Sequence, residues 1–147
     1  TFLGMIVENM PSLSSYLILA AASSVAVPLG YSAEKPPVVV TQIFNRPHPE
    51  LADKVVIVQR IEIIPGGSAP AHRHPGMVTG YVESGTLEFQ VEGEPLLLLK
   101  KGDTFFEKPG SHHLVARNPD KTQKTVVIAF VINPKDTPVS EPLHGHP

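Results

Sequence analysis

Two histidines separated by one residue, His72 and His74, directly follow a Gly-Gly-Ser-Ala-Pro-Ala stretch. Alternate residues of an extended chain face the same way, so both imidazole rings project to the same side. Imidazole is a common ligand of Fe, Ni, Cu and Zn. A second pair, His112 and His113, lies far along the chain after a Pro-Gly turn. Neighbouring strand residues face opposite sides, so only one of that pair can join the first two. The pattern indicates a metal site; solvent-exposed histidines at a loop edge are the alternative.

The elements that must position these rings are short strands. The 16 prolines and 11 glycines favour turns over long helices. Apolar and β-branched runs separated by turn residues predict strands over residues 36–44, 54–64, 77–83, 86–91, 96–100, 104–107, 112–117 and 125–132. Many short strands at near-regular spacing are typical of an all-β sandwich or barrel. The continuous run of leucines at 96–99 predicts a strand buried on both faces, for which a subunit contact is one explanation.

Length and composition set further limits. The 147 residues suit one domain with a substantial core. The net charge is −2 and the chain has no basic patch, which argues against nucleic acid as a partner. The chain contains no cysteine, so neither a disulfide framework nor a thiolate metal site is available.

The first 35 residues are considered apart from the fold. No charged residue lies between Glu8 and Glu34, and residues 16–30 are rich in Ala, Leu and Val. This is typical of the apolar region of a secretory signal. No Lys or Arg precedes the run, so an N-terminal arm packed on the domain or on a second subunit is the alternative. Cleavage after residue 26 would make the protein secreted or periplasmic; otherwise we expect a cytoplasmic protein. Pro28 and the shortness of the run argue against a membrane span.

Two segments resemble the two motifs of the cupin superfamily. Residues 66–85, GGSAPAHRHPGMVTGYVESG, are similar to the first motif, and residues 102–113, GDTFFEKPGSHH, are similar to the second. The resemblance covers roughly residues 38–132 and is strongest to small single-domain cupins (monocupins). It implies a cupin-type jelly-roll (double-stranded β-helix) barrel. The expected organisation is an N-terminal arm or signal-like segment over 1–35, a cupin domain over 36–134 and a C-terminal tail over 135–147.

The resemblance assigns His72, His74 and His113 as metal ligands, because the motif places its last histidine at a fixed distance after Gly110. The glutamate ligand of the motif, however, falls on Val78. Three neutral imidazoles leave a divalent ion with its full charge, which would attract anionic groups of a substrate. Alternatively Glu107, just before the second Pro-Gly turn, completes the ligand shell or serves as a base; an exposed carboxylate at the rim is the other interpretation.

Two further side chains are candidates for a substrate pocket. Arg60 lies in an alternating strand and would grip a substrate carboxylate if its face lines the barrel. A salt bridge with Glu62 is the alternative. Tyr81 either lines the cavity or packs.

These residues favour a metal-dependent cupin enzyme acting on a small organic molecule, and the charge of the ion favours an anionic one. The leading hypothesis is a dioxygenase-type oxidoreductase that uses Fe(II) as its metal, with Mn, Ni, Cu and Zn left open. A non-catalytic cupin that binds a small ligand or metal, and a cupin lyase, isomerase or cyclase, are the alternatives, since one fold hosts many functions. A homodimer is expected from the resemblance.

Overall fold

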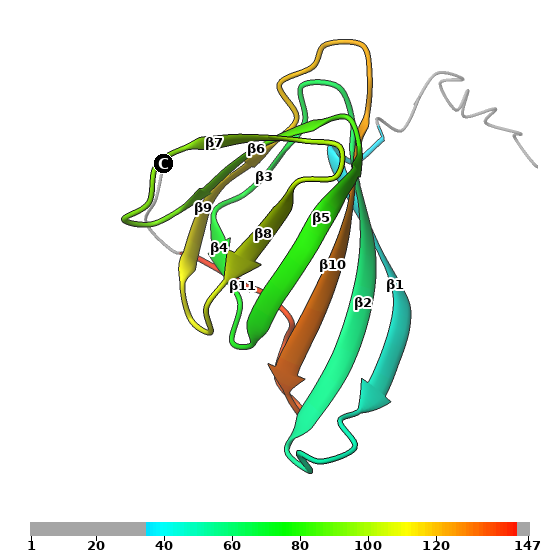
Figure 1. Cartoon of the computed structure of the whole chain (residues 1–147), viewed down its shortest axis with the longest axis vertical. Helices are drawn as coiled ribbons and strands as arrows, with labels where there is room; N and C mark the ends of the chain where they lie inside the picture. Colours follow the sequence, from blue (N-terminus) through cyan, green and yellow to red (C-terminus); the bar gives the residue numbers. More distant parts are fainter. Residues whose placement is uncertain (1–34, 144–147) are drawn as a thin grey trace, which may run out of the picture. The chain divides into compact units, whose positions relative to one another are not determined.

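The computed structural model describes residues 35–143, which form strands and turns with no helix among them (Figure 1). Two antiparallel sheets make up this part of the chain. The first has the order β1-β2-β10-β5-β8. Its strands are β1 (Val38–Pro47), β2 (Lys54–Ile63), β5 (Met77–Ser84), β8 (Thr104–Glu107) and β10 (Thr125–Pro134).

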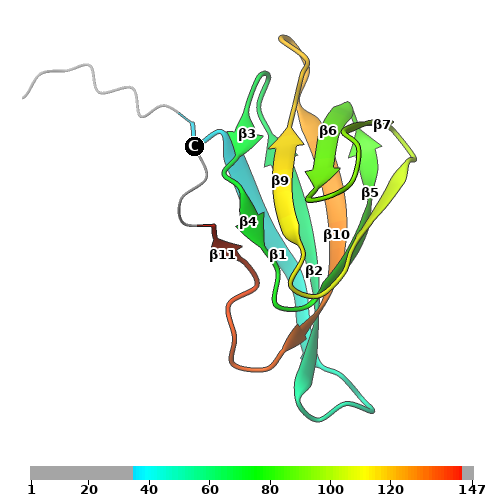
Figure 2. The ribbon, with the colours of Figure 1, turned by 90° about the vertical axis from the view of Figure 1, so that its left-hand side faces the viewer.

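The second sheet has the order β11-β4-β9-β6-β7, and β3 also pairs with β9 (Figure 2). Its strands are β3 (Ser68–Ala69), β4 (His72–Arg73), β6 (Thr86–Val91), β7 (Leu97–Lys100), β9 (His112–Arg117) and β11 (Glu141–Pro142). Side chains of both sheets line one common cavity, so the sheets face each other. This confirms the predicted all-β jelly-roll architecture.

Period-two alternation decides which side chains fill the space between the sheets. In β2, Ile61 and Ile63 face inward, and in β10, Val127 and Val131 do the same. Phe89 of β6 meets them from the other sheet and belongs to the same buried cluster as Ile63 and Val127. Full burial of such a side chain stabilises the fold by about 1.5–3 kcal/mol. The apolar core therefore holds the two sheets together and forms the cavity wall.

All the strands predicted from the sequence are present, and their ends differ from the predicted ones by at most three residues. The prediction for the leucine run is wrong. Leu98 is 55% exposed and only Leu99, at 8%, is buried, because β7 is the edge strand of its sheet. Strands β3, β4 and β11 were missed because each is two residues long.

Within residues 35–143 the model contains no apolar helix of membrane-spanning length. The predicted N-terminal arm or signal-like segment lies outside the described residues, apart from Lys35. The predicted C-terminal tail is described as far as residue 143, and it contributes β11, which pairs with β4.

Candidate metal centre

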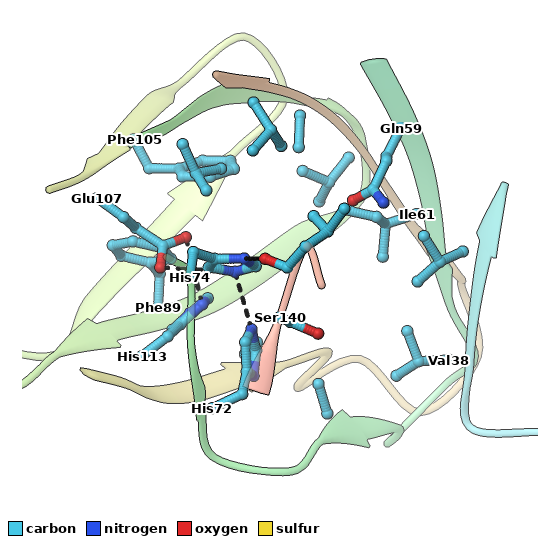
Figure 3. A pocket seen from close by; sticks show the side chains of 18 of the residues that line it. Val38, Gln59, Ile61, His72, His74, Phe89, Phe105, Glu107, His113 and Ser140 are labelled. Carbon is cyan, nitrogen blue, oxygen red and sulfur yellow. Dashed lines mark hydrogen bonds and ion pairs between the residues drawn. The ribbon is translucent and has the colours of Figure 1, made fainter. Parts of the chain in front are cut away.

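Three histidine rings from two neighbouring strands converge inside the barrel (Figure 3). His72 of β4 and His113 of β9 are directly opposite each other in the ladder. His74 follows β4, and its carbonyl oxygen accepts a hydrogen bond of 2.8 Å from the backbone N–H of Gly110. Gly110 has a φ of 77°, which favours glycine, so the second Pro-Gly turn fixes this link between the two histidine segments. One ligand atom from each ring lies within 4.8 Å of the others.

The rings of His72 and His74 present lone pairs to each other. Nδ1 of His72 lies 2.7 Å from the carbonyl oxygen of Pro70, and Nδ1 of His74 lies 2.7 Å from that of Val139. A carbonyl oxygen only accepts hydrogen bonds, so each Nδ1 carries the proton and each neutral ring keeps its lone pair on Nε2. These two Nε2 atoms are 3.1 Å apart. Two facing lone pairs repel unless a cation lies between them, and nitrogens about 2.1 Å from one ion are separated by about this distance.

A backbone carbonyl also orients His113, but it contacts Nε2 rather than Nδ1. Its Nε2 lies 2.9 Å from the carbonyl oxygen of Val115, so the lone pair is on Nδ1. Among the described residues, this buried Nδ1 has no hydrogen-bond partner. Each of the three histidines thus has one nitrogen fixed by a backbone carbonyl and the other directed into the cluster. Backbone carbonyls commonly orient metal-binding histidines in this manner, and the donor set fits a divalent transition metal.

Glu107 lies beside the three rings rather than at the rim. Its side chain is 2% exposed. Its Oε1 is 3.3 Å from His113 Nδ1, and its Oε2 is 3.9 Å from His74 Nε2. Oε2 has no hydrogen-bond partner among the described residues. The carboxylate therefore borders the histidine cluster on the side of His74 and His113.

The register explains how this carboxylate compensates for the apolar residue in the first motif. Val78 of β5 is directly opposite Glu107 of β8. Opposite residues of an antiparallel pair point to the same face of the sheet. The carboxylate thus enters the site at the level of Val78, from the neighbouring strand.

Burial sets the protonation of the cluster. It raises the pKa of Glu107 to about 7. It is also the main reason that the pKa of His113 is lowered to about 3, with repulsion from His72 and His74 adding to it. The pKa of His74 is lowered, chiefly by burial. These shifts favour neutral imidazoles near pH 7, which is the form that binds metal.

Comparison with protein families identifies the fold. The family model described as a cupin domain matches residues 59–139, more than half of the chain. The chain belongs to the cupin family. A comparison with curated proteins gave no match.

Solved structures agree with this assignment. The cupin is similar to the DMSP lyase DddQ from Ruegeria pomeroyi DSS-3, at 20% identity and a TM-score of 0.62, over 76% of this chain and 54% of the lyase. The chain thus spans about half the length of that lyase. It also matches an RmlC-like cupin from Shewanella frigidimarina NCIMB 400, at 20% identity and a TM-score of 0.55, over 69% of this chain and 81% of the other. An oxalate oxidase in complex with the substrate analogue glycolate matches at 25% identity and a TM-score of 0.54, over 69% of this chain and 54% of the oxidase.

The cavity beside the histidine cluster of this cupin has a volume of about 500 Å³. This is within the usual range for a site that holds one small organic molecule. Its walls are mostly aliphatic and aromatic. The polar side chains that line it are Gln59, His72, His74, Glu107, His113 and Ser140.

Two predicted pocket residues of the cupin lie elsewhere. Arg60 is not among the residues that line the cavity; it pairs with Glu62, and its Nε is 3.7 Å from Glu83. Tyr81 is 37% exposed and also does not line the cavity. Neither residue lines this cavity, because Arg60 and Tyr81 alternate with the inward residues of β2 and β5 and so lie on the outer face, and the alternative of a salt bridge between Arg60 and Glu62 is present.

Sequence reasoning missed two parts of the site. Gln59 shares the inward face of β2 with Ile61, but the charged Arg60 was favoured over it as a pocket residue. The C-terminal segment contributes Val139 and Ser140 to the cavity wall, and the carbonyl of Val139 orients His74. The alternation of β2 groups Gln59 with Ile61 and Ile63 without showing which face is inward, whereas the C-terminal segment carries no comparable signal.

Proposed function

We propose that this cupin is a metal-dependent enzyme of the dioxygenase type that binds Fe(II) through His72, His74 and His113. The observation that carries the proposal is the pair of facing Nε2 lone pairs of His72 and His74, 3.1 Å apart, with the third ring close by. A bound ion of this kind supplies Lewis acidity and a template for substrates, and iron also permits oxygen chemistry.

Glu107 has two roles in this proposal. As a carboxylate it completes the ligand set with an anionic oxygen, which reduces the positive charge of the site. Its position 3.3 Å from His113 Nδ1 also allows it to hold a proton close to a bound substrate. Burial alone raises its pKa to about 7, and a divalent ion held beside it would lower that pKa and favour the carboxylate, the form that accepts a proton. This suits a group that accepts a proton from a substrate hydroxyl and later returns it.

The apolar walls provide the remaining conditions for such a reaction. Side chains such as Phe89, Phe105 and Val131 exclude water from the space next to the histidines. A dry site strengthens electrostatic interactions and limits hydrolysis of reactive species.

The test is iron binding and oxygen consumption by the full chain. Protein reconstituted anaerobically with Fe(II) is supplied with oxygen and with phenolic, thiol or 1,3-dicarbonyl compounds. We expect His74→Ala to lose both tight iron binding and oxygen uptake. The matched control is His112→Ala, since His112 is outside the cluster and pairs with Glu92 at 2.8 Å. Iron binding that survives in His74→Ala would refute the assignment of the ligands.

A lyase or isomerase is the second candidate, and the raised pKa of Glu107 favours it. A base with a pKa of about 7 can remove a proton next to a carbonyl group without any oxidant. Substrate conversion under argon would identify this class, whereas a loaded protein that converts none of the compounds would be a binding cupin.

We also propose that the outer face of the five-stranded sheet binds a second copy of the chain. A row of side chains crosses all five strands in register, consisting of Phe44, Val58, Phe130, Thr79 and Phe106. The three phenylalanines are exposed. A row that is apolar except for Thr79 suits a two-fold interface, in which each row packs on its symmetry mate.

Sedimentation of the full chain tests this interface. We expect a dimer that becomes a monomer in Phe130→Lys. Leu98→Lys is the control, because Leu98 is as exposed but lies on β7 of the other sheet. Dimers that persist in Phe130→Lys would refute the proposed interface.

A further inference from the structure

Polar groups in the cavity are segregated into two places. The histidine cluster and Glu107 occupy one side, Ser140 follows Val139, whose carbonyl contacts His74, and Gln59 of β2 lies across the cavity from the cluster (Figure 3). Aliphatic and aromatic side chains form most of the wall between these places. A molecule that spans the cavity therefore meets polar atoms near its two ends and apolar atoms along its middle.

The cavity has no cationic side chain to balance a second negative charge. In the part of the chain that the structure describes, neither lysine nor arginine lines it. Arg60 and Arg73 are sequence neighbours of residues that line the cavity, but they pair with Glu62 and Glu141 instead. An unpaired carboxylate buried among apolar side chains carries a large desolvation penalty. The ion can balance one anionic oxygen at the histidine side, but nothing balances another on the far side.

Gln59 is positioned to recognise a hydrogen-bonding group. Its cross-strand neighbour on β10 is Ala129, a small buried residue that also lines the cavity. The amide points into the cavity, and Figure 3 draws no hydrogen bond from it to the other lining side chains. A carboxamide offers both a donor and an acceptor, and it carries no charge. It therefore suits a neutral group such as a carbonyl or a hydroxyl.

We propose that the substrate is a mainly apolar small molecule with one oxygen-bearing head group at the histidine cluster and one uncharged hydrogen-bonding group at Gln59. This rests on the proposed function, because it assumes an ion held by the histidines. It also differs from the sequence-based expectation of an anionic substrate, since it excludes a charge outside the head group. The length of the apolar stretch between the two polar ends, rather than a charge, then determines which molecules bind.

Three probes with the same catechol head group and different far ends test the inference. They are 4-methylcatechol, 3,4-dihydroxyacetophenone and 3,4-dihydroxybenzoate. Binding is measured by calorimetry under argon to the full chain loaded with Zn(II), which has no redox chemistry of its own. The variants are Gln59→Leu and, as a matched control, Gln42→Leu. Gln42 is opposite Gln59 on β1 but is exposed and does not line the cavity.

We expect the two neutral probes to bind and the benzoate to bind roughly 100-fold more weakly, because its carboxylate has no partner. Gln59→Leu should weaken binding of the acetophenone about fivefold, the usual effect of one lost hydrogen bond, and leave binding of 4-methylcatechol unchanged. Gln42→Leu should alter neither. Equal or tighter binding of the benzoate would overturn the inference, as would a Gln59→Leu effect that is the same for both neutral probes.

Failure of this inference can be distinguished from failure of the proposed oxygenase function. The expected order of affinities without iron-dependent oxygen uptake would support the inference and refute the oxygenase. Iron-dependent oxygen uptake together with tighter binding of the benzoate would support the oxygenase and refute the inference about the substrate.

Discussion

Replacing Glu107 with glutamine tests whether burial keeps this carboxyl group neutral. The side chain is 2% exposed, and burial raises its pKa from 4.5 to about 7. Below pH 4.5 the group is protonated in both the folded and the unfolded chain. Between pH 4.5 and 7 the unfolded chain loses the proton while the folded protein keeps it, so the free energy of unfolding falls as the pH rises. At 1.36 kcal/mol per pH unit, this interval corresponds to about 3 kcal/mol.

Glutamine has a similar shape and does not ionise, so Glu107→Gln should not show this loss. We expect urea unfolding of the chelator-treated protein to give similar stabilities at pH 4.5, and an advantage of about 3 kcal/mol for the variant at pH 8. The titration of His113 is present in both proteins and largely cancels in the difference. Glu92→Gln is the control, because Glu92 is exposed. If the free energies of unfolding of Glu107→Gln and of the unchanged protein differ by the same amount from pH 4.5 to pH 8, the reasoning is refuted.

Three further predictions concern the same framework. Val78→Glu alone should destabilise the protein by about 3 kcal/mol, because it buries a second carboxyl group opposite Glu107. The double variant Val78→Glu with Glu107→Val again has a single carboxyl group at this level, and calorimetry should show that it binds metal tightly. Asn118→Ala should lower the free energy of unfolding by about 3 kcal/mol, since the Asn118 amide donates to the carbonyl oxygens of Ile63, Ile64 and Gln123 from a fully buried position. Loading with Zn(II) should slow amide hydrogen exchange in β8 but not in β7, and Glu107→Gln should remove most of this effect.

The sequence was sufficient to predict the strands and the convergence of the three rings. Alternation and turn residues determined where the longer strands lie, whereas the choice of His113 over His112 came from the resemblance to the second cupin motif. These features are local, since each depends on a few neighbouring residues and on the period of a strand. His72 of β4 and His113 of β9 face each other in the ladder, and a one-residue shift of either strand would have pointed one ring away.

The surroundings of the cluster could not be predicted because they depend on contacts between distant segments. Whether Arg60 or Gln59 enters the cavity depends on which face of β2 is inward. Alternation shows which residues share a face but not which face is inward. The buried position of Glu107 depends on its pairing with Val78. The role of Val139 requires the C-terminal segment to return beside β4, which no periodic pattern in that segment indicates.

The site joins the two sheets. The three histidines belong to β9, to β4 and to the residue following it, whereas Glu107 ends β8 of the other sheet. One Pro-Gly turn connects Glu107 to His113, so a change in the spacing of the sheets alters the distance between carboxylate and imidazole. An ion that binds both groups must therefore draw β8, an edge strand with four residues, toward the second sheet. The same carboxyl group carries a proton near neutral pH when burial alone determines its charge. If Glu107 binds the ion as proposed, ion binding, proton release and the fixing of an edge strand are linked through one side chain, which a glutamate in β5, an inner strand, would not achieve.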